Sequence, residues 1–114
     1  MKEVRRNEVS EGEFTLVFLA EDENESQLEL TYNWDNNEPY SGGDNFRHVA
    51  CSVESIYDYC EKLGKKGVTI LRPQRDGKMA FIRFQDQISI ELLQQGNPLT
   101  IHEPWSSMEN RGKW

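Results

Sequence analysis

The sequence predicts an α+β fold built from two related units, and three observations support this prediction. Residues 47–94 have the pattern of one strand, one helix and three further strands, whereas residues 3–34 have the pattern of three strands only. The last strands of the two sets also end alike, with Leu-Glu-Leu around Glu29 and Ile-Glu-Leu around Glu91, 62 residues later. This separation suits a duplicated unit. We therefore expect paired βαβββ units, the first of which lacks its opening strand and helix.

The second unit is the more regular of the two. The segment RHVACSV (47–53) alternates polar and apolar residues and is typical of a strand. Ser55 is expected to cap a helix, with Asp58 three residues later as in a capping box. Gly67 is expected to end this helix. The apolar residues of the helix recur at helical spacing and predict one buried stripe, made of Ile56, Tyr59, Cys60 and Leu63.

Short strands complete both units. In the second unit they are expected at 68–72, 78–84 and 87–94, with turns at Gly77 and at 85–87. In the first unit they are expected at 3–9, 13–21 and 26–34. Because side chains alternate along a strand, Leu28 and Leu30 should point into the core, and Glu29 should point to the opposite face.

The length of 114 residues is enough for one domain. We interpret residues 1–94 as a single domain, with a partial first unit at 1–34 and a complete second unit at 47–94, followed by a tail at 95–114. The first-unit equivalent of His48 would fall about 14 residues before Met1. The pattern therefore predicts that the chain starts inside a unit.

Composition excludes several classes of function. No apolar run approaches the roughly 20 residues of a membrane helix, and the N-terminus lacks the apolar core of a signal peptide. Thirteen basic against twenty acidic residues give a net charge of −7, which disfavours general binding to nucleic acids. We expect a cytoplasmic protein with neither membrane nor nucleic acid as a partner. In that compartment Cys51 and Cys60 should be reduced, buried thiols.

Three residues are candidates for metal binding or catalysis. Glu29, His48 and Glu91 each lie on a predicted strand beside apolar residues, so each side chain should leave the core face. One imidazole and two carboxylates form a mixed nitrogen and oxygen set that suits Zn²⁺, Ni²⁺, Co²⁺ or Mn²⁺. A carboxylate beside such a metal can also carry a proton. The alternative interpretation is that these side chains are solvated surface.

The chain contains, in this order, the segments LELTYNW (28–34), RHVACSVE (47–54) and ISIELL (88–93). These three segments resemble motifs of the glyoxalase I (lactoylglutathione lyase) family of the vicinal oxygen chelate superfamily. The resemblance spans residues 3–94 and implies the same paired βαβββ fold. It makes Glu29, His48 and Glu91 three of four ligands of a divalent metal, Ni²⁺ or Zn²⁺, with Co²⁺ as a further option. It also implies a homodimer with shared sites, in which one chain supplies Glu29 and the other supplies His48 and Glu91.

The resemblance further implies a reaction. In the family, the hemithioacetal of methylglyoxal and glutathione is converted to S-D-lactoylglutathione. By position, Glu91 would be the base that removes the C1 proton, and Glu29 the opposed carboxylate. Asn33 matches a residue that contacts the γ-glutamyl end of glutathione. The loop 76–79 resembles a segment that covers substrate, which would place Lys78 and Met79 in the substrate site.

A cluster of basic residues lies within 62–83 and is a candidate for attracting the carboxylates of glutathione. The alternative interpretation is a solvated helix face and strand edges. The cluster consists of Lys62, Lys65, Lys66, Arg72, Arg75, Lys78 and Arg83.

The sequence also departs from the family pattern. It has no counterpart of the first metal-binding histidine or of a glutathione-binding arginine, and Gln85-Asp86-Gln87 replaces the usual Asp-Pro-Asp-Gly turn. His102, in a proline-flanked tail, is a poor substitute for that histidine. Two alternatives therefore stay open: a non-catalytic small-molecule-binding protein of the same fold, and another enzyme of the superfamily, such as an epimerase or a dioxygenase. The fourth ligand, the metal in the cell, the thiol substrate, the role of the tail and the reason why the first unit lacks its opening strand and helix are also open.

Overall fold

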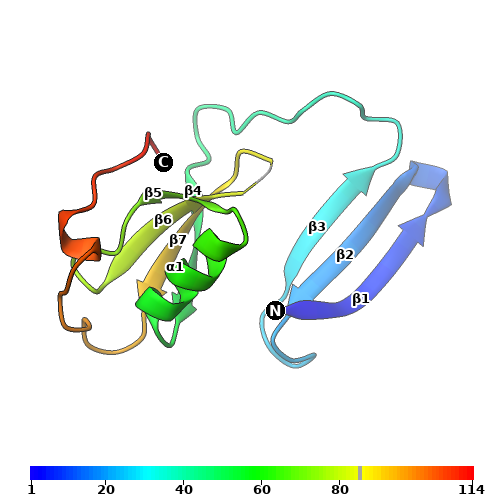
Figure 1. Ribbon diagram of the computed structural model, residues 1–114. Helices are drawn as coiled ribbons and strands as arrows, with labels where there is room; N and C mark the ends of the chain where they lie inside the picture. The colour runs from blue at the N-terminus through cyan, green and yellow to red at the C-terminus, as the bar shows by residue number, and fades with distance from the viewer. Residues whose placement is uncertain (85) are drawn as a thin grey trace. The chain divides into compact units, whose positions relative to one another are not determined.

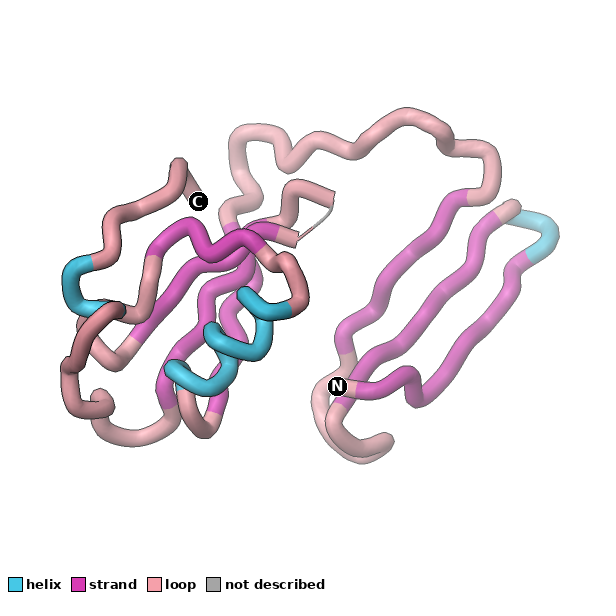
Figure 2. The backbone as a smooth tube through the Cα atoms, in the orientation of Figure 1, coloured by secondary structure: helices cyan, strands magenta, loops and turns pink. Residues whose placement is uncertain are grey.

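The computed structural model describes residues 1–84 and 86–114, and it divides the chain into two compact units. The N-terminal unit comprises Met1–Glu38 and the C-terminal unit Pro39–Trp114. Each unit contains its own β-sheet, as Figure 1 shows. Strands and one α-helix together give the α+β class that the sequence predicts, and the tracing in Figure 2 shows the helix within the C-terminal unit.

The N-terminal unit is an antiparallel sheet in the order β1-β2-β3. Its buried residues come mainly from the middle strand, where Phe18 is 6% exposed. The Arg5 guanidinium lies 3.7 Å from the centroid of the Phe18 ring and covers it through a cation–π contact. At the end of the sheet, Trp34 Nε1 donates a hydrogen bond to Thr15 Oγ1 (2.8 Å). The strands are β1 (Lys2–Val9), β2 (Phe14–Ala20) and β3 (Leu28–Asn33), with a 3₁₀ turn at Ser10–Gly12.

Strand β3 forms where the sequence predicts it, but the prediction that its leucines are buried is wrong for this unit by itself. Leu28 is 37% exposed and Leu30 is 43% exposed. The physical reason is that β3 is an edge strand, and the described residues of this unit, 1–38, include no α-helix to pack on its apolar face.

The C-terminal unit has the strand, helix and three strands that the sequence predicts. Its sheet has the order β4-β7-β6-β5, in which β4 and β7 are parallel and the other neighbours antiparallel. Among the described residues, no helix is long and apolar enough to cross a membrane. The elements are β4 (His48–Val53), α1 (Ile56–Lys65), β5 (Thr69–Arg72), β6 (Met79–Arg83) and β7 (Ser89–Gln94), followed by a 3₁₀ turn, η2 (Trp105–Ser107).

Helix α1 begins and ends at the expected signals. Ser55 is its N-cap, and the backbone N–H of Asp58 donates to Ser55 Oγ (3.4 Å). The helix ends at Lys65, and Gly67 follows in the left-handed region with φ of +81°. Side-chain capping and a glycine stop therefore place both boundaries within two residues of their predicted positions.

The buried stripe of α1 differs from the prediction at one position. Tyr59 is 46% exposed, whereas Tyr57 is 9% exposed and belongs to the core. Tyr57 is buried because residues of the tail pack on it: the His102 ring lies 4.3 Å away and the Trp105 ring 6.4 Å away, centroid to centroid. The tail thus widens the buried side of the helix, and periodicity within the helix alone could not show this.

Both cysteines are free, but only one is fully buried. Cys60 is 0% exposed, and burial raises the pKa of its thiol to about 12. A thiol with so high a pKa stays protonated and is a poor nucleophile. Cys51 is half-buried, so the expectation of two buried thiols is correct for Cys60 alone.

The turn between β6 and β7 is only partly described, because Gln85 lies outside the described residues. On either side of it, the Phe84 N–H donates to the Ile88 carbonyl (3.0 Å) and the Gln87 N–H donates to the Phe84 carbonyl (3.1 Å). These two hydrogen bonds close the chain reversal that joins the strands.

The turn at Gly77 is the position most sensitive to a side chain. Gly77 has φ of +65°, and an added Cβ would lie 2.2 Å from the Leu99 carbonyl oxygen, whereas Gly67 has φ of +81° and open space around it. Gly67→Ala should cost about 1–2 kcal/mol of folding free energy through backbone strain alone. Gly77→Ala should cost at least about 1 kcal/mol more, because backbone must also move. Urea unfolding measures both, and equal losses would contradict the close approach to Leu99.

Candidate metal-binding and catalytic site

Parallel pairing of β4 with β7 brings two of the predicted site residues together. In this register His48 lies opposite Ser89, and Ala50 lies opposite Glu91, so the His48 and Glu91 side chains leave the same face of the sheet. His48 Nε2 is 3.2 Å from Glu91 Oε2, and in the tautomer protonated at Nε2 it donates a hydrogen bond to that oxygen. The side chains are 32% and 15% exposed, respectively. The pair is thus preformed and open to solvent.

The face that carries this pair is the one away from the core around α1. The alternate residues Ile90 and Leu92 pack with that core, whereas Glu91 lies opposite Phe81 in the pairing of β6 with β7. The Phe81 ring meets the His48 ring edge-on, with centroids 5.2 Å apart and an angle of 90° between the planes. An aromatic side chain therefore supports the imidazole on the side of β6.

The geometry of the pair fits a divalent metal. Two donor atoms bound to one ion at about 2.0–2.2 Å, with angles of about 90–110°, lie about 2.8–3.6 Å apart. The separation of 3.2 Å between His48 Nε2 and Glu91 Oε2 falls within this range. An imidazole nitrogen with a carboxylate oxygen suits Zn²⁺, Ni²⁺ and Co²⁺. Within residues 1–84 and 86–114, however, no three His, Cys, Asp or Glu side chains converge, and a metal ion held by this pair would need further donors.

Glu29 and Asn33 belong to β3 of the N-terminal unit. Glu29 lies opposite Phe18 in the pairing of β2 with β3, on the sheet face that also carries Arg5. It is exposed, as is Asn33 at the end of the strand, where the Asn33 carbonyl accepts a hydrogen bond from Asn36 N–H (3.3 Å). That Glu29 shares a metal with the pair on β4 and β7 stays a prediction.

Lys78 and Met79 lie on a tight turn that Asp76 organises. The Asp76 carboxylate accepts hydrogen bonds from the backbone N–H groups of Lys78 (3.0 Å) and Met79 (3.1 Å) and from the Arg72 guanidinium (2.8 Å). Burial acts to raise the pKa of Asp76, but these hydrogen bonds outweigh it and hold the pKa below its ordinary value. These hydrogen bonds therefore stabilise the turn. The Lys78 side chain is exposed, and that of Met79 is half-buried.

The arginines of the basic cluster serve the fold. Arg75 donates to the Met108 carbonyl (2.9 Å), and Arg83 donates to the carbonyls of Gln87 (3.0 Å) and Lys113. These contacts hold loops and the tail in place, which supports the alternative interpretation of the cluster as structural. The lysines of the basic cluster are exposed, so their charges face solvent.

The tail supplies a neighbour of the site that the sequence did not indicate. The Trp114 ring stacks on Phe81, with centroids 5.0 Å apart and 20° between the planes. Residues 95–114 show no periodicity, and their only signal is the presence of two tryptophans in a polar segment. That signal suggests packing but does not identify the face on which it occurs.

Residues 1–92 match the family model for the Glyoxalase/Bleomycin resistance protein/Dioxygenase superfamily, and the chain belongs to this superfamily. The more specific likeness is to lactoylglutathione lyases. The chain is 38% identical over 102 residues to the lactoylglutathione lyase of Neisseria meningitidis serogroup B, covering 83% of this chain and 73% of that protein. It is also 38% identical to a probable lactoylglutathione lyase of Synechocystis, covering 82% and 76%.

Solved structures give the same result. The trypanothione-dependent glyoxalase I of Leishmania major is similar with a TM-score of 0.77 and 33% identity, covering 82% of this chain and 68% of that one. Glyoxalase I from Zea mays is similar with a TM-score of 0.72 and 27% identity, covering 84% of this chain and 36% of that one. The motifs around Glu29, His48 and Glu91 thus predict the family correctly.

The ionised Asp76 should contribute to stability in a pH-dependent way. Because its pKa is lowered in the folded state, the contribution is complete above the ordinary aspartate pKa of about 3.9 and is lost as pH falls through the lowered value. Asp76→Asn should therefore lower the free energy of unfolding at pH 7, measured with urea, by less than about 1 kcal/mol because solvent screens the ion pair with Arg72. The difference from the native protein should shrink below about pH 4; a difference that does not change with pH would contradict this account.

Proposed function

We propose that this chain is a metal-dependent lactoylglutathione lyase-like enzyme, which converts the hemithioacetal of methylglyoxal and glutathione to S-D-lactoylglutathione in the cytoplasm. The observation that carries the proposal is the His48–Glu91 pair, whose donor atoms lie 3.2 Å apart on an open sheet face. Its support is the family membership and the 38% identity to proteins named lactoylglutathione lyase.

The proposed metal ligands are His48, Glu91 and Glu29, and the proposed ion is Ni²⁺ or Zn²⁺, with Co²⁺ as a further candidate. When bound, such an ion stabilises the negative charge that develops on oxygen during the reaction. The nitrogen and oxygen donor set of the pair suits all three ions.

The reaction itself is an internal redox exchange that needs one proton carrier. Glu91 takes the proton from C1 of the hemithioacetal, and the electron pair of that C–H bond moves toward the C2 carbonyl to give an enediolate. A proton then returns to C2, and the proton of the C1 hydroxyl passes to the C2 oxygen, so that C1 becomes the thioester carbonyl and C2 the alcohol, with no external oxidant. Glu29 is the opposed carboxylate in this scheme.

Further residues are assigned to the thiol end of the substrate. Asn33, Lys78 and Met79 are the proposed contacts, and the turn braced by Asp76 presents the last two. The structural relative from Leishmania major is described as trypanothione-dependent, whereas the curated relatives are named for lactoylglutathione. Glutathione is the thiol that we propose for this chain.

We also propose a homodimer with shared sites. Glu29 belongs to the N-terminal unit, and His48 with Glu91 to the C-terminal unit, so the three ligands come from two separate sheets. The exposed Leu28, Leu30 and Tyr32 on β3 are apolar area that association would help to cover.

Metal removal is the first test of the proposal. After dialysis against a chelator the chain should form no thioester from methylglyoxal and glutathione, and added Ni²⁺, Co²⁺ or Zn²⁺ should restore it, as followed by thioester absorbance. Glu91→Gln should lower kcat by about 10²–10⁴-fold in the reconstituted protein. Glu61→Gln, on the exposed side of α1, is the matched control and should keep full activity.

Two results would contradict the proposal in different ways. Bound metal without turnover for any of the three ions would favour a non-catalytic binding protein of this fold. Retained activity in Glu91→Gln would remove this residue from the role of base.

The shared site is tested by mixing two inactive variants. Glu29→Gln and Glu91→Gln should each be inactive alone. A mixed dimer should regain one intact site, with Glu29 from one protomer and His48 with Glu91 from its partner. Random exchange at equal amounts should therefore restore about a quarter of native activity. No recovery after verified subunit exchange would show that each site is built within one chain.

A further inference from the structure

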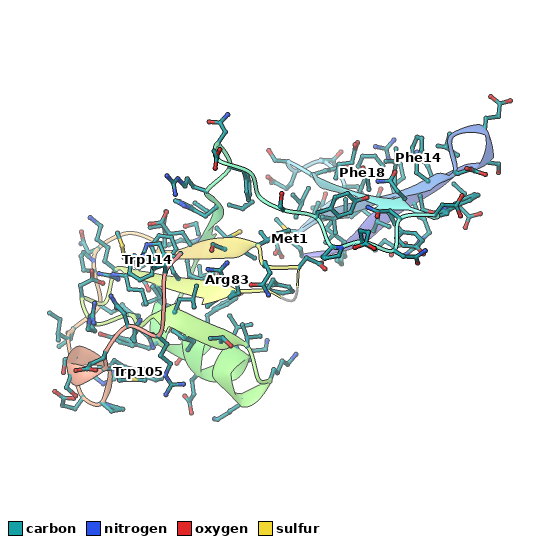
Figure 3. The ribbon with its side chains drawn as sticks, turned by 90° about the horizontal axis from the view of Figure 1, so that it is seen from above. Met1, Phe14, Phe18, Arg83, Trp105 and Trp114 are labelled. Carbon is teal, nitrogen blue, oxygen red and sulfur yellow. The ribbon has the colours of Figure 1, made fainter. Side chains whose placement is uncertain are left out.

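The end of the chain is fastened along the strands that flank the candidate site. The Arg111 N–H donates to the Leu71 carbonyl on β5 (2.7 Å), and the Arg83 guanidinium on β6 donates to the Lys113 carbonyl. Figure 3 shows Arg83 and Trp114 beside the yellow strands of the C-terminal unit. These hydrogen bonds use backbone groups of the tail, so they fix its path and thereby the position of Trp114.

Trp114 contacts Phe81, and Phe81 contacts His48, which belongs to the candidate metal-binding pair. Phe81 stacks on Trp114 (centroids 5.0 Å apart, 20° between the planes) and forms a T-shaped pair with the His48 ring (centroids 5.2 Å apart, 90° between the planes). Phe81 is only 5% exposed although it lies on the sheet face away from α1. The indole of Trp114, itself 38% exposed, helps to cover it.

We propose that Trp114 is a positioning residue for His48, acting through Phe81. The inference rests on the proposed function, in which His48 is a metal ligand. His48 lies at the start of an edge strand, and its side chain is 32% exposed, so its contacts with Glu91 and Phe81 are important in limiting rotation of the ring. A terminal sp³–sp² torsion has broad minima, and the neighbouring Phe81 ring restricts it. Trp114 holds the Phe81 ring in place, and Nε2 of His48 then faces Glu91.

Outer contacts of this kind are known to matter for metal sites in general. The orientation of a ligating imidazole is set largely by groups that do not touch the metal, and their loss weakens metal affinity. Here the outer contact comes from a segment with no local sequence pattern. Loss of the contact from the tail should therefore change the orientation of the His48 ring, and weaker metal affinity should follow from that change.

The chain offers a matched control in the same tail. It contains two histidines, and each lies beside an aromatic ring that contacts one tail tryptophan. Trp105 stacks on Tyr57, which contacts His102, on the side of the sheet that carries α1. The same substitution at the two tryptophans should therefore affect different histidines.

The first measurement uses the metal-free chain at one fixed pH. Trp114→Ala should shift or broaden the ring-proton NMR signals of His48 and leave those of His102 unchanged, whereas Trp105→Ala should do the reverse. Trp114→Phe, which keeps a ring to stack on Phe81, should resemble the native protein. Urea unfolding of each variant identifies any that fail to fold.

The second measurement is Ni²⁺ affinity by calorimetry. Trp114→Ala should weaken binding about two- to tenfold, and Trp105→Ala should leave it unchanged. Phe81→Leu should weaken it to a similar extent, and the double variant Phe81→Leu/Trp114→Ala should be no weaker than Phe81→Leu alone, because both substitutions break one chain of contacts.

The two proposals fail in distinguishable ways. If the native chain binds no Ni²⁺, Co²⁺ or Zn²⁺, the proposed metal site is wrong, and the His48 signals still decide the role of Trp114. If Trp114→Ala folds and leaves the His48 signals unchanged, or if its effect on Ni²⁺ affinity adds fully to that of Phe81→Leu, the positioning role of Trp114 is overturned.

Discussion

Strands β4 and β7 are the first and last strands of the C-terminal unit, and their parallel pairing places His48 beside Glu91 across 43 residues of sequence. A parallel pair needs a crossover, which α1 provides. The start of this helix is fastened to the end of β7: the Ile56 N–H donates to Gln94 Oε1 (2.8 Å), and Gln94 Nε2 donates to the Glu54 carbonyl (2.7 Å). The site therefore depends on helix packing that occurs on the other face of the sheet.

Alternation along β7 keeps this arrangement in register. Ile90 and Leu92 pack with the core, and Glu91 between them points to the opposite face. A slip of one residue would bury the carboxylate and expose both apolar side chains, which is costly in both respects. The residues that stabilise the sheet thus also fix the direction of the proposed base. The same alternation on β6 buries Ala80 and Ile82 and leaves Phe81 beside the site.

Much of the C-terminal unit could be predicted, because its signals are local. The polar and apolar alternation of the strands, the Ser55 cap and the glycine stop are read within a few residues of chain, and the structure has all of them. The burial of Tyr57 and the position of Trp114 depend on contacts from the tail, over 40 and 30 residues away, so no local pattern contains them. The exposure of Leu28 and Leu30 has the same origin, since alternation identifies an apolar face but not what covers it.

A further constraint follows from the division into two units. The pair on β4 and β7 supplies two donors, and two donors hold a divalent ion less firmly than the three or four protein ligands of most zinc sites. In the proposed enzyme the third, Glu29, comes from a sheet whose strand pairing is independent of the C-terminal unit. An ion bound by all three would link the two sheets, and its binding free energy would also favour their association. Metal affinity and assembly would then be linked, since each raises the population in which the ligands converge. A rigid His48 strengthens this link, because an imidazole already oriented toward Glu91 loses little rotational freedom when the third ligand arrives.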